Sequence, residues 1–132
     1  MATAVIPEDA HDLLDGAAFG YVATTMPDGA PQLSPVWIGW HEGAVAFNTA
    51  AGRFKAHNLQ RDPRVVVCVH DQRDPQRYLL VRGRAELVWE GAVAHIEALS
   101  QRYEGKPFRA LKDGEQRVIV RVQSDHVEHR RA

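Results

Sequence analysis

The sequence has one cysteine, no long apolar run and no recognisable export signal, and each shortage excludes a class of protein. Cys68 has no second cysteine to pair with, so we expect a reduced, cytoplasmic protein without disulfides. No apolar stretch approaches the ~20 residues that a transmembrane helix needs. The first residues also lack the basic, apolar and small-residue order of a secretory signal. We therefore expect no membrane span.

An excess of charge of one sign is missing as well. Sixteen basic and seventeen acidic residues leave a net charge of −1. A general nucleic-acid binder usually shows a positive excess, and a disordered chain usually shows strong net charge with few apolar residues. We expect neither class and no nucleic-acid partner. The 132 residues, 45% of them apolar, predict a single globular domain over residues 1–132.

Local patterns predict three helices and six strands in the order α-βββ-α-ββ-α-β. Helices are expected where apolar residues recur at helical spacing or where start and stop signals flank a polar segment. Strands are expected in short runs of β-branched and aromatic residues bounded by turns. The first three strands should form an antiparallel meander. The predicted helices are 7–15, 52–63 and 91–103, and the predicted strands are 19–25, 32–41, 44–49, 64–70, 78–89 and 116–127.

Two residues inside the predicted strands carry further information. Pro35 cannot donate to a strand ladder, so it implies a bulge or an edge position. Gly83 suggests a bulge or a sharp bend. Six strands with mostly short antiparallel connections favour an α+β, mainly β fold: a small six-stranded antiparallel barrel with flanking short helices. Such a barrel has little free interior, so a ligand should bind outside it or between two copies.

The strongest chemical signal is the segment from Asn48 to Leu59. A strand ends there in small polar residues, the chain crosses Gly52, and a helix begins with Arg53 and Lys55. Free N–H groups at a helix start, a hydroxyl and two cations make an anion site, and phosphate accepts both kinds of cation. Cations are also unfavourable at this end of a helix unless an anion compensates. The alternative is a basic first turn exposed to water, and the residues alone leave both interpretations open.

A second candidate is the strand segment from Gln32 to Trp37. A bulged strand leaves backbone donors unpaired, and such donors can meet the carbonyl edge of a flat heterocycle. Gln32 and Ser34 would add polar contacts. The alternative is an ordinary strand whose Trp37 and Trp40 fill the core or an oligomer interface.

Other reactive side chains show no catalytic pattern. The seven histidines have no metal-ligand spacing and no cysteine pair to assist them, so we predict no metal site. No nucleophile motif is present, and Cys68 is expected to be a small core residue inside an apolar strand. We therefore predict no catalytic side chain. Solvent-facing positions are expected for Asp9, Asp12, Asp15, His126 and His129.

Several motifs together resemble a known family. They are GYVATT at 20–25, DGAPQLSPV at 28–36, GRFKAHNLQRDPRV at 52–65, YLLVRGRAEL at 78–87 and AHIEALSQRYEG at 94–105. The chain resembles the pyridoxamine 5′-phosphate oxidase-like, flavin-binding split β-barrel proteins. Within them it is most similar to the actinobacterial branch that uses the deazaflavin coenzyme F420, the flavin/deazaflavin oxidoreductases of B type.

The resemblance implies a homodimeric six-stranded split barrel with cofactor sites at the subunit interface. It implies a hydride transfer between reduced coenzyme F420 and a small conjugated acceptor, in which no side chain need act as acid or base. The cofactor phosphate would lie on the basic pair, the ring along the second strand, and the partner chain over its other side. The implied cofactor-binding residues are Gln32, Ser34, Pro35, Val36, Trp37, Thr49, Arg53, Lys55, Asn58 and Tyr78.

Alternatives within the same resemblance are an FMN-dependent oxidoreductase or flavin reductase, and a non-catalytic protein that carries F420 or binds haem. True pyridoxamine phosphate oxidases hold their substrate with a basic C-terminal segment, which does not follow the last predicted strand here. Pyridoxamine phosphate is therefore not the expected substrate. Phe54 separates Arg53 from Lys55, and this spacing is typical of the deazaflavin branch.

Overall fold

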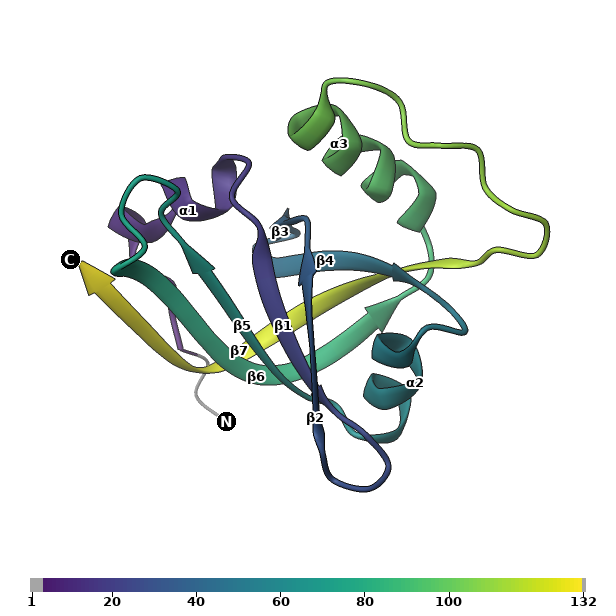
Figure 1. Cartoon of the computed structure of the whole chain (residues 1–132), viewed down its shortest axis with the longest axis horizontal. Helices are drawn as coiled ribbons and strands as arrows, with labels where there is room; N and C mark the ends of the chain where they lie inside the picture. The colour runs from purple at the N-terminus through teal and green to yellow at the C-terminus, as the bar shows by residue number, and fades with distance from the viewer. Residues whose placement is uncertain (1–3, 132) are drawn as a thin grey trace.

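The fold is one curled antiparallel sheet of seven strands in the order β2-β1-β5-β6-β7-β4-β3, with short helices around it (Figure 1). The computed structural model describes residues 4–131. Within them, no helix is long and apolar enough to cross a membrane. The elements are the 3₁₀ helix η1 (Glu8–Ala10), α1 (Asp12–Asp15), β1 (Gly20–Thr25), β2 (Pro31–Val36), β3 (Ile38–His41), β4 (Ala44–Ala50), α2 (Phe54–Arg61), β5 (Arg64–His70), β6 (Arg77–Val88), α3 (Ala92–Glu104) and β7 (Arg117–Arg131).

The sheet has seven strands and not six because the predicted strand 32–41 breaks at Trp37. Its first half, β2, pairs with β1, and its second half, β3, pairs with β4 at the opposite edge. The predicted meander is therefore wrong, because the chain crosses from one sheet edge to the other after β2. Pro31 and Pro35 remove two backbone donors from β2, which restricts it to an edge. The split barrel is otherwise confirmed, and of the two options for Pro35 the edge position is correct.

A tyrosine hydroxyl fastens this break in the strand. The backbone N–H of Ile38 donates to Tyr103 Oη at 2.9 Å, and Tyr103 Oη donates to the carbonyl of Ala18 at 2.7 Å. Tyr103 lies on α3, so the helix supplies the partner that a neighbouring strand would otherwise provide. The Tyr103 side chain thereby joins the start of β3 to the segment just before β1.

The hydrophobic core fills the inside of the curled sheet. Inward side chains from six strands are fully buried there: Val22, Ile38, Phe47, Val67, Leu79 and Val120 are among them. Their alternation along the strands is the period-2 pattern of a sheet with one buried face. The helix α3 covers the other face of β4 and β7 over a smaller apolar cluster. The site described below lies at the edge of these two layers.

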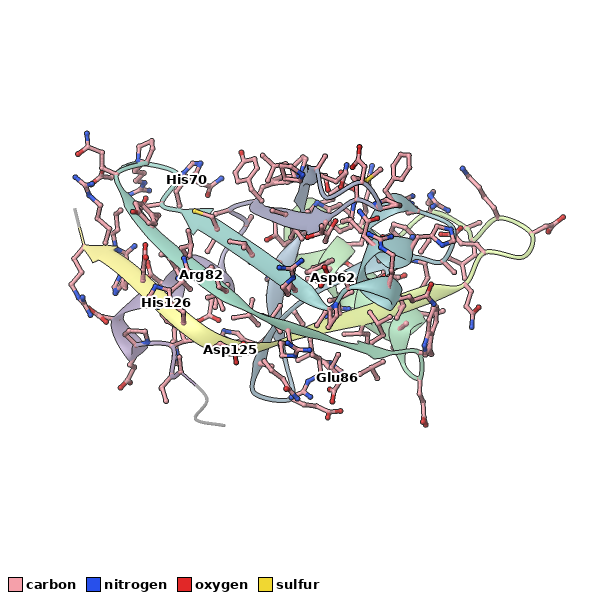
Figure 2. The ribbon with its side chains drawn as sticks, turned by 90° about the horizontal axis from the view of Figure 1, so that it is seen from below. Asp62, His70, Arg82, Glu86, Asp125 and His126 are labelled. Carbon is pink, nitrogen blue, oxygen red and sulfur yellow. The ribbon has the colours of Figure 1, made fainter. Side chains whose placement is uncertain are left out.

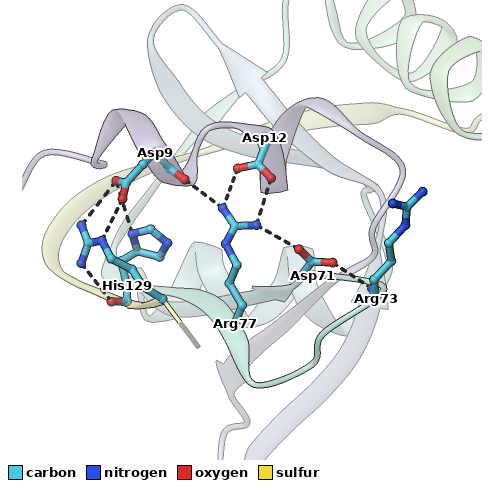
Figure 3. Close-up of polar contacts among 7 residues, drawn as sticks. Asp9, Asp12, Asp71, Arg73, Arg77 and His129 are labelled. Atoms are coloured by element: carbon cyan, nitrogen blue, oxygen red, sulfur yellow. Dashed lines mark hydrogen bonds and ion pairs between the residues drawn. The ribbon is translucent and has the colours of Figure 1, made fainter.

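Ion pairs join η1 and α1 to the first residue of β6, Arg77, and the last residue of β7, Arg131 (Figure 3). Arg77 donates to both carboxylate oxygens of Asp12, at 2.9 and 2.7 Å, and Arg131 donates to Asp9 at 2.8 Å. These hydrogen bonds lower the pKa of both carboxyls. The side chains of Asp9 and Asp12 remain 58% and 65% exposed, so their predicted solvent-facing positions are confirmed, although both carboxylates also form ion pairs. The same prediction is wrong for His129, because β7 continues to Arg131 and the His129 side chain is only 3% exposed.

The outer face of β2, β1, β5 and β6 is apolar in its middle, between His70 and Arg82, although no element of the described chain covers it. Cys68 pairs with Tyr21 on one side and Leu80 on the other, and it is half-buried, not a core residue as predicted. Its thiol pKa is raised by partial burial. Leu33 is 64% exposed and Tyr21 38% exposed. We call this surface the outer apolar face; it consists of Tyr21, Leu33, Val66, Cys68 and Leu80.

Gly83 marks the predicted irregularity in β6. The pairing of β6 with β7 shifts register between Arg82 and Gly83, so the expected bulge is confirmed. Arg82, just before the shift, stands opposite His126 of β7 (Figure 2). A Cβ atom at Gly83 would lie 1.9 Å from the carbonyl oxygen of Gln123. Only a residue without a side chain fits this approach of two backbones.

We predict that Gly83→Ala lowers the free energy of unfolding by about 1–3 kcal/mol, because the methyl group must displace the β7 backbone. Denaturant unfolding followed by circular dichroism measures this loss. Gly16→Ala is the matched control, since its added Cβ would lie 3.7 Å from the nearest atom. Equal stabilities of the two variants would contradict the close approach at the bulge.

Candidate functional site

A cleft of about 240 Å³ opens between the end of β2, the end of β4 and the overlying α3. The segment 105–116, which connects α3 to β7, closes its outer side. Basic, polar and aromatic groups from six separate parts of the chain meet there. The lining residues are Phe19, Pro35, Val36, Trp37, Asn48, Thr49, Arg53, Lys55, Ile96, Leu99, Phe108, Arg109 and Arg117.

The start of α2 supplies two of the cations. Gly52 adopts a φ of +94°, a left-handed conformation that turns the chain from β4 into the helix. The first backbone N–H groups of α2 have no intrahelical acceptor, and no side chain caps them. Arg53 is exposed at the rim, and Lys55 is half-buried with its Nζ 3.0 Å from Ser34 Oγ. This is the arrangement expected of an anion site.

The charge on these two residues is not neutralised by the protein. Within residues 4–131, neither Arg53 nor Lys55 forms an ion pair. Burial lowers the pKa of Lys55, and the nearby Arg53 and Arg117 lower it further. Any anion that enters the cleft stabilises the protonated, charged form of Lys55 and so counteracts the lowering of its pKa. The cleft is therefore electrostatically prepared for a negative group.

Thr49 adds an unpaired hydroxyl to the same place. The residue is 1% exposed, and its Oγ1 has no hydrogen-bond partner within the described chain. A buried hydroxyl without a partner costs free energy, so such groups usually serve a ligand or a water. Thr49 lines the cleft beside the two cations. It is thus a buried hydroxyl in the wall of the cleft whose hydrogen-bonding capacity is unused within the described chain.

Arg117 is a third cation that the sequence interpretation missed. It opens β7, pairs across the ladder with Ala50 and is 5% exposed. Its Nε donates to Asn48 Oδ1 at 2.9 Å and its Nη1 to Glu115 Oε2 at 2.9 Å. An arginine directly before the apolar run 118–120 was the available signal. Its position next to Arg53 follows only from the register of β4 and β7.

Glu115 holds the segment 105–116 against this arginine. Its carboxylate accepts two hydrogen bonds from Arg109, at 2.8 and 3.0 Å, one from the backbone of Lys112 at 2.9 Å and one from Arg117. These hydrogen bonds, of which those from Arg109 have the largest effect, hold the pKa of Glu115 well below its usual range. One carboxylate thus balances two of the four cations around the cleft, and Arg53 and Lys55 remain uncompensated.

Aromatic rings form the apolar wall of the cleft. Trp37 stacks on Tyr103 with centroids 5.5 Å apart and planes 18° apart, and Phe108 meets Trp37 edge-on at 6.4 Å. Phe19 packs edge-on against Tyr103 and is 46% exposed. Flat ligands pack well on such surfaces. The cleft therefore combines a polar anion end with an aromatic end.

The structure brings together most, but not all, of the cofactor-binding residues that were predicted from the sequence. Pro35, Val36, Trp37, Thr49, Arg53 and Lys55 line the cleft, and Ser34 contacts Lys55. Gln32 lies on the same side of β2 as Ser34, and its Oε1 is buried without a partner in the described chain.

Asn58 and Tyr78 are not brought to the cleft. The amide of Asn58 donates to Thr24 Oγ1 at 3.0 Å and so joins α2 to β1, and the residue does not line this cleft. Tyr78 lies at the start of β6, opposite His70 and Arg130. Within one chain Tyr78 and Lys55 do not meet.

A larger cavity lies elsewhere. About 650 Å³ opens beside Trp40, β4, β7 and the segment before η1. Its one guanidinium, Arg121, is already bound to the carbonyls of His41 and Glu42 and to Glu86. The smaller cleft is the better candidate because two of its cations, Arg53 and Lys55, form no ion pair within residues 4–131. The described part of the chain holds no group of three His, Cys, Asp or Glu side chains arranged for a metal ion.

Comparisons with known proteins agree with this architecture. A family model described as pyridoxamine 5′-phosphate oxidase matches residues 6–131. A solved structure named F420 reductase is 33% identical, with a TM-score of 0.82 over 93% of this chain and 98% of that chain. The conserved hypothetical protein Rv2991 from Mycobacterium tuberculosis is 28% identical, with a TM-score of 0.77 over 99% and 88%. A putative pyridoxamine 5′-phosphate oxidase from Listeria innocua shares the fold at 18% identity, with a TM-score of 0.70 over 92% and 94%.

We predict that Glu115→Gln destabilises the protein by about 1–3 kcal/mol at neutral pH, because two arginines lose their shared counter-ion. The pKa of Glu115 is depressed in the folded state, so its contribution is present above the usual value of 4.5 and is lost as the pH falls below it. The stability difference between wild type and variant should shrink in acid. Urea unfolding across this pH range measures it, with the exposed Glu104→Gln as control. A constant difference would contradict the prediction.

Proposed function

The chain belongs to the pyridoxamine 5′-phosphate oxidase family, and we propose that it is an oxidoreductase that binds coenzyme F420 in the cleft at the start of α2. In this proposal it transfers a hydride between the reduced deazaflavin and a small conjugated acceptor. The family, together with the 33% identical protein named F420 reductase, supports a flavin or deazaflavin cofactor. The choice of F420 over FMN is the finer part of the proposal.

The observation that carries the proposal is the unpaired, partly buried charge of Lys55. Lys55 and Arg53 have no carboxylate partner in the described chain, and the unpaired Oγ1 of Thr49 is buried beside them. A cofactor phosphate supplies the missing negative charge and several acceptor oxygens. These residues therefore fit a phosphate group.

The remaining cleft residues fit a flat ring. The free edge of β2 carries Ser34 and Pro35, and Trp37 follows it directly. Backbone groups along this edge can bond to the polar edge of a ring, while the aromatic wall at Trp37 excludes water from its face. When bound, the deazaflavin supplies the hydride chemistry at its C5 atom. The task of the chain is to bind the ring, orient it and shield it, and we assign no catalytic acid or base.

A second copy of the chain is part of this proposal. The outer apolar face has its exposed Leu33 and Tyr21 on two neighbouring strands and continues through Val66, Cys68 and Leu80. Monomers rarely expose such a contiguous apolar surface. Tyr78 lies on the same side of β6 as Leu80, so a partner placed on this face can present its own Tyr78 toward the first chain.

The second candidate function is FMN-dependent redox chemistry on the same fold. The family description and the fold match with the Listeria protein favour it. A carrier of F420 or haem without turnover is the third. Cofactor preference separates the first two, and turnover of an acceptor separates an enzyme from a carrier.

We predict that coenzyme F420 quenches the tryptophan fluorescence of the purified protein and binds more tightly than FMN, because Trp37 lines the cleft. Arg53→Ala and Lys55→Ala should each weaken F420 binding by ~1–3 kcal/mol, the value of a charge-assisted contact. Arg73→Ala, which removes an exposed arginine outside the cleft, is the control. Tighter binding of FMN would favour the second function. Unchanged affinity in the Arg53 and Lys55 variants would refute the phosphate assignment.

We predict that Leu33→Glu converts a dimer to monomers, because a charge at this position would be buried without a partner. Sedimentation equilibrium measures the mass. Val93→Glu is the matched control: Val93 is 54% exposed on α3, away from the outer apolar face. A wild-type monomer, or a dimer that survives Leu33→Glu, would contradict this interface.

A further inference from the structure

A chain of three buried polar side chains runs between α3 and the face of the sheet that it covers, and it ends at the cleft. His95 of α3, Asn48 of β4 and Arg117 of β7 are 9%, 8% and 5% exposed. The His95 Nδ1 atom lies 3.0 Å from Asn48 Nδ2, and Arg117 Nε lies 2.9 Å from Asn48 Oδ1. Asn48 Nδ2 also donates to the carbonyl of Ala92 at 2.9 Å. Both hydrogens of the Asn48 amide nitrogen and its oxygen are therefore engaged in hydrogen bonds.

The direction of every hydrogen bond in this chain follows from Arg117. An arginine Nε can only donate, so the atom of Asn48 that faces it must be the carbonyl oxygen. The amide nitrogen then donates both its hydrogens, one to Ala92 and one to His95. His95 must accept at Nδ1, which places its single proton on Nε2. Burial lowers the pKa of His95 to about 4, so the neutral ring that this bond needs is present at neutral pH.

The far end of Arg117 remains available to a ligand. Its Nη1 is bound to Glu115 and its guanidinium lies over the ring of Phe108, 5.3 Å from the centroid. Within residues 4–131 no hydrogen bond engages Nη2, and this atom is not among the fully covered unpaired atoms. Arg117 lines the cleft that holds Arg53 and Lys55. A free guanidinium edge is thus presented to the same space.

We propose that Asn48 and His95 are positioning residues that hold Arg117 in place as the third cation for the cofactor phosphate. This inference rests on the proposed function. The repulsion between Arg117 and its neighbours Arg53 and Arg109 would otherwise push a flexible side chain out of the cleft. Asn48 and Glu115 fix two sides of the guanidinium, so little conformational freedom remains to be lost when an anion binds. His95 acts one step further away, by fixing which way the amide of Asn48 points.

A purely structural role is the competing explanation. Asn48 also ties the first turn of α3 to β4 through Ala92, so its removal costs stability in either case. The two roles differ in one respect: a positioning residue affects the ligand only while Arg117 is present. A double-mutant cycle measures this dependence directly.

The experiment is F420 titration by tryptophan fluorescence on wild type, Asn48→Ala, Arg117→Met and the double variant, each shown to be folded by circular dichroism. Asn48→Ala should weaken binding ~10-fold, the effect of losing about one charge-assisted hydrogen bond. In the Arg117→Met background it should have no further effect. An equal loss in both backgrounds, or no loss in the single variant, would overturn the positioning role. Wild-type protein that binds neither F420 nor FMN would instead overturn the proposed function.

A second measurement needs no cofactor and no variant. Nitrogen-15 NMR of the histidine side chains reports which ring nitrogen carries the proton. Our assignment requires a neutral His95 protonated at Nε2 at neutral pH. A proton on Nδ1, or a doubly protonated ring, would place the Asn48 amide the other way round and remove its bond to Arg117. That result would overturn the proposal even if the variants failed to fold.

Discussion

Positive charge gathered at one end of the barrel, with too few carboxylates to balance it, is the constraint on which the site depends. Lys55 comes from the first turn of α2, Arg117 from the start of β7 and Arg109 from the segment between α3 and β7. Like charges this close repel each other, so the side chains stay together only where an anion lowers the repulsion or hydrogen bonds hold them in place. Glu115 supplies part of the balance by binding Arg109 and Arg117. The charge of Arg53 and Lys55 is not balanced within residues 4–131, and this distinguishes the smaller cleft chemically from the larger cavity beside Trp40.

The fold serves this site through its break at Trp37. β2 and β3 lie at opposite edges of the curled sheet, and only Trp37 joins them, so the two edges come together at this residue, next to Tyr103 of α3. Tyr103 holds that crossing in place and also carries the ring on which Trp37 stacks. One residue of α3 therefore fixes both the split of the barrel and the aromatic wall of the cleft. The polar wall depends on α3 as well, through His95 and the amide of Asn48.

Local sequence patterns predicted most elements within one or two residues, and they predicted the basic start of α2. Arg53 and Lys55 could be found because a helix start, a glycine and two cations are neighbours in sequence. Arg117 could not, since Asn48 lies 69 residues before it and only the pairing of β4 with β7 brings the two together. The same reason hid the Asp9–Arg131 contact, which spans 122 residues. The error at Trp37 arose because an edge crossing and a continuous strand have the same local composition.

The most direct test of the account is a crystal structure of the protein with coenzyme F420. The account predicts that the cofactor phosphate lies within hydrogen-bond distance of Lys55 Nζ and Thr49 Oγ1, next to the free guanidinium edge of Arg117 and at the start of α2. The ring should then lie along the edge of β2 toward Trp37. A phosphate bound in the larger cavity beside Trp40, or on the outer apolar face, would contradict the central claim.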